Sequence, residues 1–253
     1  MSSDVYLLEP QALVHIHVGE EFEVRGDEGR HAVTVKRLTV GEAVEVVDGV
    51  GRRIAVDVVR TEGKDVLVVR ATSIVDEPAS RPRVVVVQAI PKGERGEVAV
   101  ETLTEVGIDV IVPWSAQRCV TKWNGGRVER GLARWRRTAE ESTKQARRSW
   151  IPEISTLAST DDVVALVVER VAAGGRAIVL HESAVLRLAA MALPSAGDVV
   201  LIVGPEGGLT GEELAAFETA GAIPCRMGPS VLRTSTAGTA AAAVVLASTG
   251  RWS

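Results

Sequence analysis

Short runs of β-branched residues alternate with longer amphipathic segments from residue 83 onward, and this alternation most constrains the fold. Residues 83–90 contain four consecutive valines, which is typical of a strand buried on both faces. Similar apolar runs occupy residues 108–112, 177–180, 199–203 and 223–228. Helical patterns occupy residues 94–106, 127–148, 161–173 and 237–247. Five or six such alternations predict a mostly parallel α/β sheet.

The first 75 residues follow a different pattern. Residues 43–47 and 53–59 alternate between apolar and polar side chains, with a glycine-containing turn between them, so they predict a hairpin. Short strands at this spacing are typical of a small barrel. Residues 76–82 contain two prolines and three charges, a composition typical of a linker. We therefore predict a β domain at 1–75, a linker at 76–82 and an α/β domain at 83–253.

Bulk composition excludes several classes. A chain of 253 residues with 46% apolar and 25% charged residues is typical of a soluble globular protein. No apolar run approaches the roughly 20 residues of a membrane span, and the start of the chain does not resemble a signal peptide. Its two cysteines share no motif and its four histidines lack ligand spacing. We expect a cytoplasmic protein with no metal and no membrane partner.

Charge is unevenly distributed along the chain. The net charge is −4, but residues 118–148 carry ten basic and three acidic side chains, a local charge of +7. This asymmetry favours a polyanionic partner such as RNA, although a solvated helix face is the alternative. Trp123, Trp135 and Trp150 lie in or beside this segment and could stack on bases, although the helical spacing of Trp135 favours the core.

Two glycine- and hydroxyl-rich segments predict a ligand pocket. Residues 204–210 and 232–237 each follow an apolar run and precede a predicted helix, which places both at the carboxyl edge of the sheet. Neither segment fits a dinucleotide fingerprint or a P-loop. Glu206 lies in the first segment and we expect Arg233, in the second, to pair with it. A plain turn and a helix cap at Thr234 or Thr236 are the alternatives.

Several motifs in this chain together resemble one family. Residues 204–209, 227–237 and 180–182 resemble the cofactor-binding motifs of the RsmE family, the 16S ribosomal RNA uridine-N3 methyltransferases of the SPOUT superfamily. Further resemblances occur in the same order as in the family, at residues 31–41, 91–95, 105–108, 111–113, 145–148 and 151–153. The similarity thus extends over almost the whole chain.

The resemblance implies a particular architecture and a set of ligands. The fold would be a knotted SPOUT methyltransferase domain with a trefoil knot, preceded by a PUA-like β-barrel that binds RNA. The implied cofactor is S-adenosylmethionine, and the implied partners are a second copy of the chain and 16S rRNA in the small ribosomal subunit. The implied cofactor-binding residues are Leu180, His181, Val203, Gly204, Pro205, Glu206, Gly207, Gly208, Leu209, Met227, Gly228, Leu232, Thr234, Ser235, Thr236 and Ala237. The expected RNA-binding residues are His31, Lys36, Arg37, Lys92, Arg118, Lys122, Gln145, Arg147 and Arg148.

Two residues are the expected catalytic groups. Methylation at uracil N3 replaces a weakly acidic N–H, and a cation near O2 or O4 would stabilise the developing negative charge. We assign that role to Arg233, with Glu206 holding Arg233 or the cofactor and acting as a weaker candidate base. Two departures from the family pattern are Ser235, where glutamate is common, and Glu101 with Thr102, where Gln-Lys is common.

Two other functions remain open from the sequence. The chain could be a SPOUT methyltransferase acting on another rRNA or tRNA position. It could also be an inactive RNA-binding or assembly protein, which Ser235 and Thr102 would favour. A nicotinamide-dependent enzyme is disfavoured because the dinucleotide fingerprint is missing.

Overall fold

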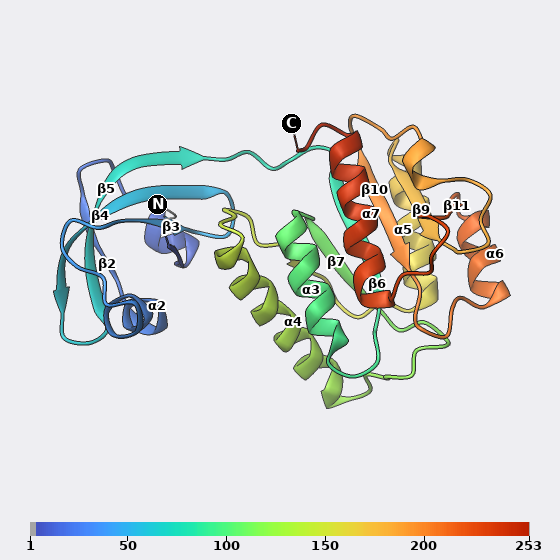
Figure 1. The fold of residues 1–253 in the computed structure, drawn as a ribbon, viewed down its shortest axis with the longest axis horizontal. Coiled ribbons are helices and arrows are strands. Elements are labelled where there is room, and N and C mark those ends of the chain that lie inside the picture. The colour runs from blue at the N-terminus through green and yellow to red at the C-terminus, as the bar shows by residue number, and fades with distance from the viewer. Residues whose placement is uncertain (1–3, 253) are drawn as a thin grey trace. The chain divides into compact units, whose positions relative to one another are not determined.

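Two sheets contain the strands of the computed structural model, which describes residues 4–252 (Figure 1). The chain divides into two units, one of Met1–Ala79 with Thr143–Ile151 and one of Ser80–Ser142 with Pro152–Ser253. The sequence placed all residues after 82 together, so the grouping of Thr143–Ile151 with the first unit differs from that expectation. Residues 1–3 and 253, the outer ends of the two predicted domains, lie outside the described residues.

The first unit acquires Thr143–Ile151 through specific hydrogen bonds. The Ser149 hydroxyl donates to the Glu77 carboxylate, and the Trp150 indole donates to the Glu77 carbonyl at 3.1 Å. The backbone N–H of Ile151 donates to the carbonyl of Gly49 at 2.9 Å. These partners are about 70 to 100 residues away in sequence, so no local pattern could have indicated the grouping.

The sheet of the first unit is mostly antiparallel. Its order is β1-β3-β4-β5-β2, and only the β1–β3 pair is parallel. The strands are β1 (Val5–Leu7), β2 (Glu21–Val24), β3 (Ala43–Val47), β4 (Arg52–Glu62) and β5 (Val66–Asp76). The helical segments are α1 (Pro10–Leu13), α2 (Gly26–Arg30) and a π-helical turn η1 (His31–Lys36). The predicted strands at 43–47 and 53–59 are confirmed.

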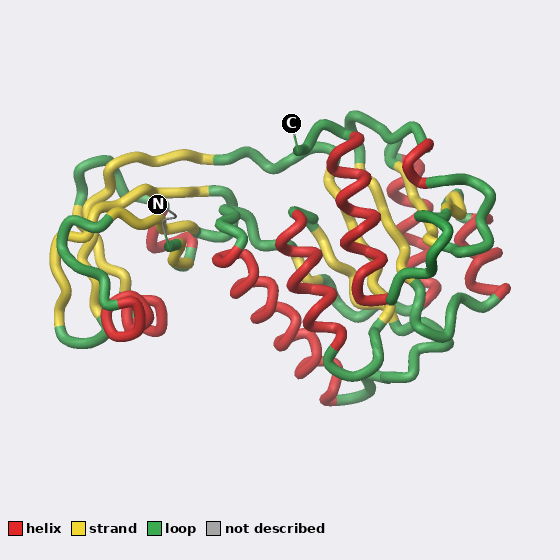
Figure 2. Tube along the Cα trace, viewed as in Figure 1, coloured by secondary structure: helices red, strands yellow, loops and turns green. Residues whose placement is uncertain are grey.

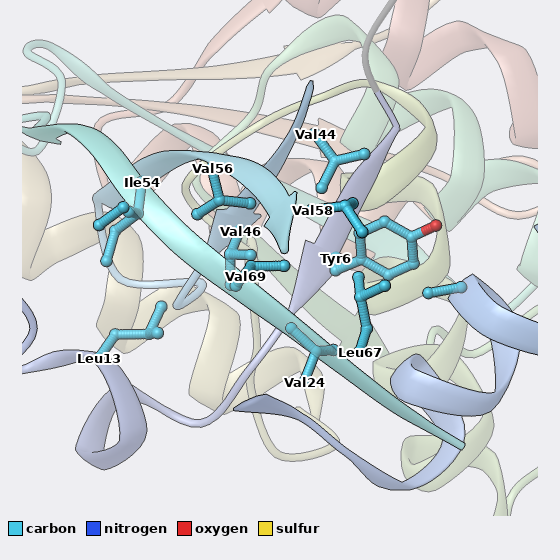
Figure 3. Close-up of a cluster of buried hydrophobic side chains, with 12 residues drawn as sticks. Tyr6, Leu13, Val24, Val44, Val46, Ile54, Val56, Val58, Leu67 and Val69 are labelled. Atoms are coloured by element: carbon cyan, nitrogen blue, oxygen red, sulfur yellow. The ribbon is translucent and has the colours of Figure 1, made fainter. Parts of the chain in front are cut away.

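Alternation along these strands builds the core of the first unit (Figure 3). Val44 and Val46 of β3 point inward, as do Ile54 and Val56 of β4. Tyr6 of β1 is 1% exposed and joins this cluster; burial raises the pKa of its hydroxyl. The period-2 pattern in the sequence therefore reports burial on one face of the sheet.

The second unit contains a six-stranded parallel sheet, as predicted. Its order is β11-β9-β10-β6-β7-β8, and every pair in the order is parallel. The strands are β6 (Arg83–Ala89), β7 (Val110–Trp114), β8 (Glu153–Ile154), β9 (Arg176–Leu180), β10 (Asp198–Val203) and β11 (Ile223–Cys225). Residues 84–89 are all buried, which explains why the four valines at 84–87 follow one another without a polar residue between them.

Helices cover both faces of this sheet, with α3 and α7 on one face and α5 on the other (Figures 1 and 2). They are α3 (Arg95–Val106), α4 (Gly126–Gln145), α5 (Thr160–Ala172), the 3₁₀ turn η2 (Leu188–Ala190), α6 (Gly211–Thr219) and α7 (Thr234–Ser248). Gly107 ends α3 with φ of 105°, in the left-handed region that favours glycine. Thr210 and Glu213 form a capping box at the start of α6.

Several boundaries differ from the sequence-based prediction, and α4, for example, ends at Gln145 instead of 148. β7 continues beyond the predicted run of 108–112 through Pro113 to Trp114. The carbonyl of Pro113 accepts from the N–H of Ala158 at 2.8 Å, and β8 is too short to need an N–H at residue 113. β11 ends at Cys225 instead of 228. α7 begins at Thr234, because the hydroxyl-rich residues enter the helix instead of forming a loop. The trefoil knot, a property of chain threading, stays a prediction.

Candidate functional site

A cavity of about 490 Å³ lies where β9, β10 and β11 end at the carboxyl edge of the parallel sheet. The arrowhead of β10 and the first turn of α7 lie at this same edge (Figure 1). The walls of the cavity are the loops after β9, β10 and β11, together with the start of α7. The lining residues are Leu180, His181, Glu182, Val203, Gly204, Pro205, Glu206, Gly207, Gly208, Leu209, Cys225, Arg226, Met227, Gly228, Ser230, Val231, Leu232, Arg233, Thr234 and Ala237.

The cavity brings together most of the residues that the sequence associated with a cofactor. Among those residues, only Ser235 and Thr236 are absent from the lining. The prediction missed five lining residues: Glu182, Cys225, Arg226, Ser230 and Val231. Three of these lie inside the motif segments 180–182 and 227–237, so the motifs already indicated them. Cys225 and Arg226 were missed because both precede the motif segment 227–237.

The first loop makes a tight turn. The N–H of Gly208 donates to the carbonyl of Pro205 at 2.9 Å, and Gly208 has φ of 71°. Glu206, at the tip, is exposed, and its Oε1 accepts from the backbone N–H of Lys92 at 3.1 Å. The expected Glu206–Arg233 ion pair is wrong: within residues 4–252, no ion pair joins these two side chains. An exposed carboxylate keeps its hydration, so it does not require an ionic partner.

The second loop leads directly into α7. Arg233 is the N-cap residue of this helix; its side chain is exposed and its carbonyl accepts from the N–H groups of Thr236 and Ala237, both at 2.9 Å. The hydroxyl of Thr236 donates to the same carbonyl at 3.3 Å. Neither Thr234 nor Thr236 caps the helix through its side chain. Arg233 therefore stands at the positive end of a 15-residue helix, beside the cavity.

Backbone hydrogen bonds join the loop after β9 to the chain after β11. The N–H of His181 donates to the carbonyl of Cys225 at 3.0 Å. Farther along, Arg226 donates to the carbonyl of Leu186 at 2.9 Å and accepts from the N–H of Leu188 at 3.0 Å. These bonds hold two of the three cavity walls against each other.

Beneath the cavity, polar side chains bind α7 to its neighbours. Gln88 of β6 is fully buried, and its amide donates to the carbonyl of Thr234 at 3.2 Å. The hydroxyls of Thr102 in α3 and Thr239 in α7 lie 2.7 Å apart. Ser235 is 6% exposed. Thr102 and Ser235, the two departures from the family pattern, thus lie at the packed side of α7 instead of in the cavity lining.

Three basic residues predicted to bind RNA lie in the second unit. Lys92 is exposed, and its backbone N–H contacts Glu206. Arg118 donates through Nη1 to the carbonyls of Gly207 and Leu209, both at 3.2 Å. Lys122 donates to the carbonyls of Ala116 at 2.8 Å and Gln117 at 3.2 Å. The charged ends of Arg118 and Lys122 thus face backbone oxygens of the protein.

The other predicted RNA contacts belong to the first unit. His31, Lys36 and Arg37 are exposed in or just after η1, and Lys36 pairs with Asp4 at 2.9 Å. Gln145 and Arg147 are exposed, whereas Arg148 is half-buried. Their contact with RNA stays a prediction.

The tryptophans have structural roles. Trp123 is 7% and Trp135 1% exposed, and their rings pack edge to face with centroids 5.2 Å apart. The core position expected for Trp135 is confirmed, whereas base stacking by Trp123 is wrong because its ring is covered. Trp150 is half-buried and bonded to Glu77.

Both thiols are covered. Burial raises the pKa of Cys119 and of Cys225, and neither side chain is more than 5% exposed. Among residues 4–252, no group of three or more His, Cys, Asp or Glu side chains has the arrangement of a metal site. The helices of the same described range are all too short or too polar to cross a bilayer.

Known proteins resemble this chain in both of its parts. Residues 78–246 match the RNA methyltransferase domain family, and residues 24–69 match the RNA methyltransferase PUA domain. Ribosomal RNA small subunit methyltransferase E of Mycobacterium bovis is 47% identical over 229 residues, which cover 90% of this chain and 87% of that protein. The protein of the same name from Bacillus subtilis is 26% identical over 226 residues, covering 85% and 86%.

Solved structures share the fold over nearly the full length. Ribosomal RNA small subunit methyltransferase E of Neisseria gonorrhoeae, bound to S-adenosylmethionine, superimposes with a TM-score of 0.84 at 22% identity and covers 97% of this chain and 98% of its own. A Legionella pneumophila methyltransferase, in complex with the same cofactor, has a TM-score of 0.82 at 26% identity and covers 98% of both chains.

Proposed function

Because this chain belongs to the family of ribosomal RNA small subunit methyltransferase E, we propose that it transfers a methyl group from S-adenosylmethionine to N3 of a uridine in 16S rRNA. The observation that carries the proposal is the cavity formed by the loops after β9, β10 and β11. The assignment of the target as N3 of a uridine rests on the resemblance of the three cavity motifs to the RsmE family.

The cavity fits the proposed cofactor in size and chemistry. A volume of about 490 Å³ lies within the range of roughly 300–1,000 Å³ typical of small-molecule sites. Apolar side chains such as Leu180, Val203 and Leu209 could cover the adenine ring of the cofactor. The carboxylates of Glu182 and Glu206 could bind the cationic and hydroxyl groups of the cofactor. The N-terminus of α7, where the helix dipole is positive, would favour the carboxylate of the cofactor. When bound, S-adenosylmethionine supplies a methyl group on a positively charged sulfur.

Arg233 is the residue that we place nearest the chemistry. Uracil N3 becomes nucleophilic as its proton passes to a base, for which Glu206 is the candidate residue, and negative charge then develops on O2 and O4. An exposed guanidinium at the N-terminus of α7 can stabilise that charge without being neutralised by Glu206. N3 lies on the Watson–Crick edge, so the target base has to be unpaired or flipped out of a helix.

Glu206 has a supporting role in this proposal. Its Oε1 accepts from the N–H of Lys92, which attaches the first cavity loop to the chain after β6. The carboxylate is exposed beside the cavity and would orient a cofactor or substrate group. Positioning is the main contribution of the protein, because methyl transfer requires nucleophile, methyl and sulfur in line.

Three further features belong to the same proposal: a cytoplasmic location, the trefoil knot and a homodimer. Exposed apolar side chains beside the cavity support the dimer, since Val185 is 88% and Val231 is 78% exposed and a partner subunit would cover them. Size-exclusion chromatography tests it. Elution as a monomer of 26.8 kDa would contradict the dimer.

The reaction is tested with small ribosomal subunits from a strain that lacks this activity. The purified chain is added with isotope-labelled S-adenosylmethionine, and the 16S rRNA is digested and its nucleosides are analysed by mass spectrometry. Labelled 3-methyluridine is the expected product. A different labelled nucleoside would refute the N3 assignment. No labelled product, with cofactor binding intact by calorimetry, would mean another RNA substrate.

The role of Arg233 is tested by Arg233→Ala. Loss of a donor to a developing oxyanion lowers turnover by about 10²–10³, while we expect the cofactor dissociation constant to stay within about threefold. Equal losses in turnover and cofactor affinity would show that Arg233 binds the cofactor and does not stabilise the transition state.

A further inference from the structure

Residues 115–122, which follow β7, lie against the first cavity loop. Arg118 reaches across from this segment, and its Nη1 donates to the carbonyls of Gly207 and Leu209 at 3.2 Å each. Both acceptors belong to residues that line the cavity. The two segments are about 90 residues apart in sequence, so the contact is a product of the tertiary fold.

The backbones also fit closely at this contact. A Cβ atom added to Gly207 would lie 3.0 Å from Cβ of Arg118 and 3.2 Å from its carbonyl oxygen. These separations are shorter than ordinary van der Waals contact, so a side chain at residue 207 would require Arg118 to shift by a few tenths of an ångström. The glycine permits Arg118 to lie directly on the loop.

A buried carboxylate joins the same two segments from below. Glu213 is 1% exposed; its Oε1 accepts from the N–H of Gln117 at 2.8 Å and its Oε2 from the N–H of Thr210 at 3.0 Å. Lys122 donates to the carbonyls of Ala116 and Gln117, which holds the segment in its own conformation. Gln117 and Arg118, adjacent in sequence, therefore contact the first turn of α6 and the second half of the loop.

We propose that Arg118 is a positioning residue for the cofactor loop, acting through the carbonyls of Gly207 and Leu209, and not a contact to RNA phosphate. The loop contains Gly204, Gly207 and Gly208 and has high conformational entropy when unrestrained. Restraining it before the ligand arrives reduces the entropy lost on binding and so raises affinity. The inference rests on the proposed function for the identity of the cofactor.

The experiment separates cofactor affinity from RNA affinity. Calorimetry measures the dissociation constant of S-adenosylmethionine for the full-length wild type, Arg118→Ala and Arg118→Lys. Filter binding without the cofactor measures affinity for small ribosomal subunits at several salt concentrations. Arg130→Ala is the matched control, since Arg130 is an exposed arginine of α4 in the same basic segment.

Arg118→Ala should bind S-adenosylmethionine about tenfold more weakly, as expected for the loss of a charge-assisted hydrogen bond. Arg118→Lys should be intermediate, because an ammonium can donate to both carbonyls but its side chain is shorter. The slope of log affinity against log salt should be unchanged for both variants. Arg130→Ala should keep the wild-type cofactor affinity.

Two results would overturn the inference. If Arg118→Ala keeps cofactor affinity within twofold while its salt slope falls by about 1, Arg118 contacts phosphate. If Arg118→Lys binds the cofactor no better than Arg118→Ala, hydrogen bonding to the two carbonyls is not the cause of the loss. A wild-type protein that binds no S-adenosylmethionine would instead refute the proposed function, and the inference with it.

Discussion

The substitution Gly131→Ala tests how α4 packs in the second unit. Gly131 lies in the second turn of this helix and is buried against Trp123. Alanine in place of glycine in a helix interior normally stabilises it by about 1 kcal/mol, because glycine loses more backbone entropy on folding. Propensity alone therefore predicts a more stable variant, whereas the contact predicts the opposite.

The contact with Trp123 decides whether the substitution stabilises or destabilises the protein. A Cβ at position 131 would lie 2.7 Å from Cε2 of Trp123 and 2.8 Å from Cδ2 and Cζ2, whereas ordinary contact begins at 3.4 Å. The Trp123 ring would have to move, but it is buried and also packs edge to face on Trp135. Overpacking of this kind costs about 1–3 kcal/mol. Subtracting the gain in propensity leaves a net loss of about 1 kcal/mol in the free energy of unfolding.

Thermal unfolding followed by circular dichroism measures the effect. A loss of about 1 kcal/mol lowers the midpoint by about 2–4 °C for a chain of this size. The matched control is Gly126→Ala at the first residue of the same helix, where nothing lies within 4 Å of the added Cβ. We expect this control to raise the midpoint by about 1–2 °C.

A third variant isolates the ring as the cause. In a Trp123→Leu background the clash is relieved, so Gly131→Ala should become neutral or stabilising, and the two substitutions should couple. The reasoning is refuted if Gly131→Ala raises the midpoint as much as Gly126→Ala does in the wild-type background.

Two further predictions concern titratable groups. Burial acts to raise the pKa of Glu77, but hydrogen bonds from Ser149 and Arg53 lower it below its ordinary value. The contribution of Glu77 to stability is therefore complete above about pH 5 and is lost as the pH falls through the folded-state pKa. The difference in unfolding midpoint between wild type and Glu77→Gln should shrink as the pH is lowered from 7 to 3. A difference that stays constant over this range would contradict the prediction. Burial raises the pKa of Cys119 and Cys225, so iodoacetamide at pH 7.5 should add to neither thiol in the folded protein and to both in guanidinium, as intact mass would record. Rapid single labelling of the folded protein would contradict the second prediction.

Local patterns in the sequence predicted the elements well because their causes are local. A strand buried on both faces is apolar at nearly every position, as at the four valines 84–87. The capping box of Thr210 and Glu213 operates over three residues. Gly107 ends α3 because few other residues adopt its positive φ.

Predictions of partners across the fold were less accurate. Glu206 and Arg233 were expected to pair because both follow strands at the same edge, yet Glu206 contacts the backbone of Lys92. Proximity of two loops does not determine which groups within them meet. The order β9-β10-β6 places the chain after β6 beside the loop after β10, and this neighbour supplied the partner.

The sequence by itself determined the class of most segments, the parallel sheet and two of the loops that line the cavity. These follow from residue type and short-range spacing, which act within a few residues, whereas the third loop, at residues 180–182, was indicated by the family resemblance. Only the tertiary structure decided what the charged side chains contact. Arg118 belongs to a basic segment that is typical of RNA binding, yet its guanidinium donates to carbonyls 89 and 91 residues away. The charge of a side chain can be read from the sequence. The group that it contacts depends on the order of the strands in the sheet, which no local pattern encodes.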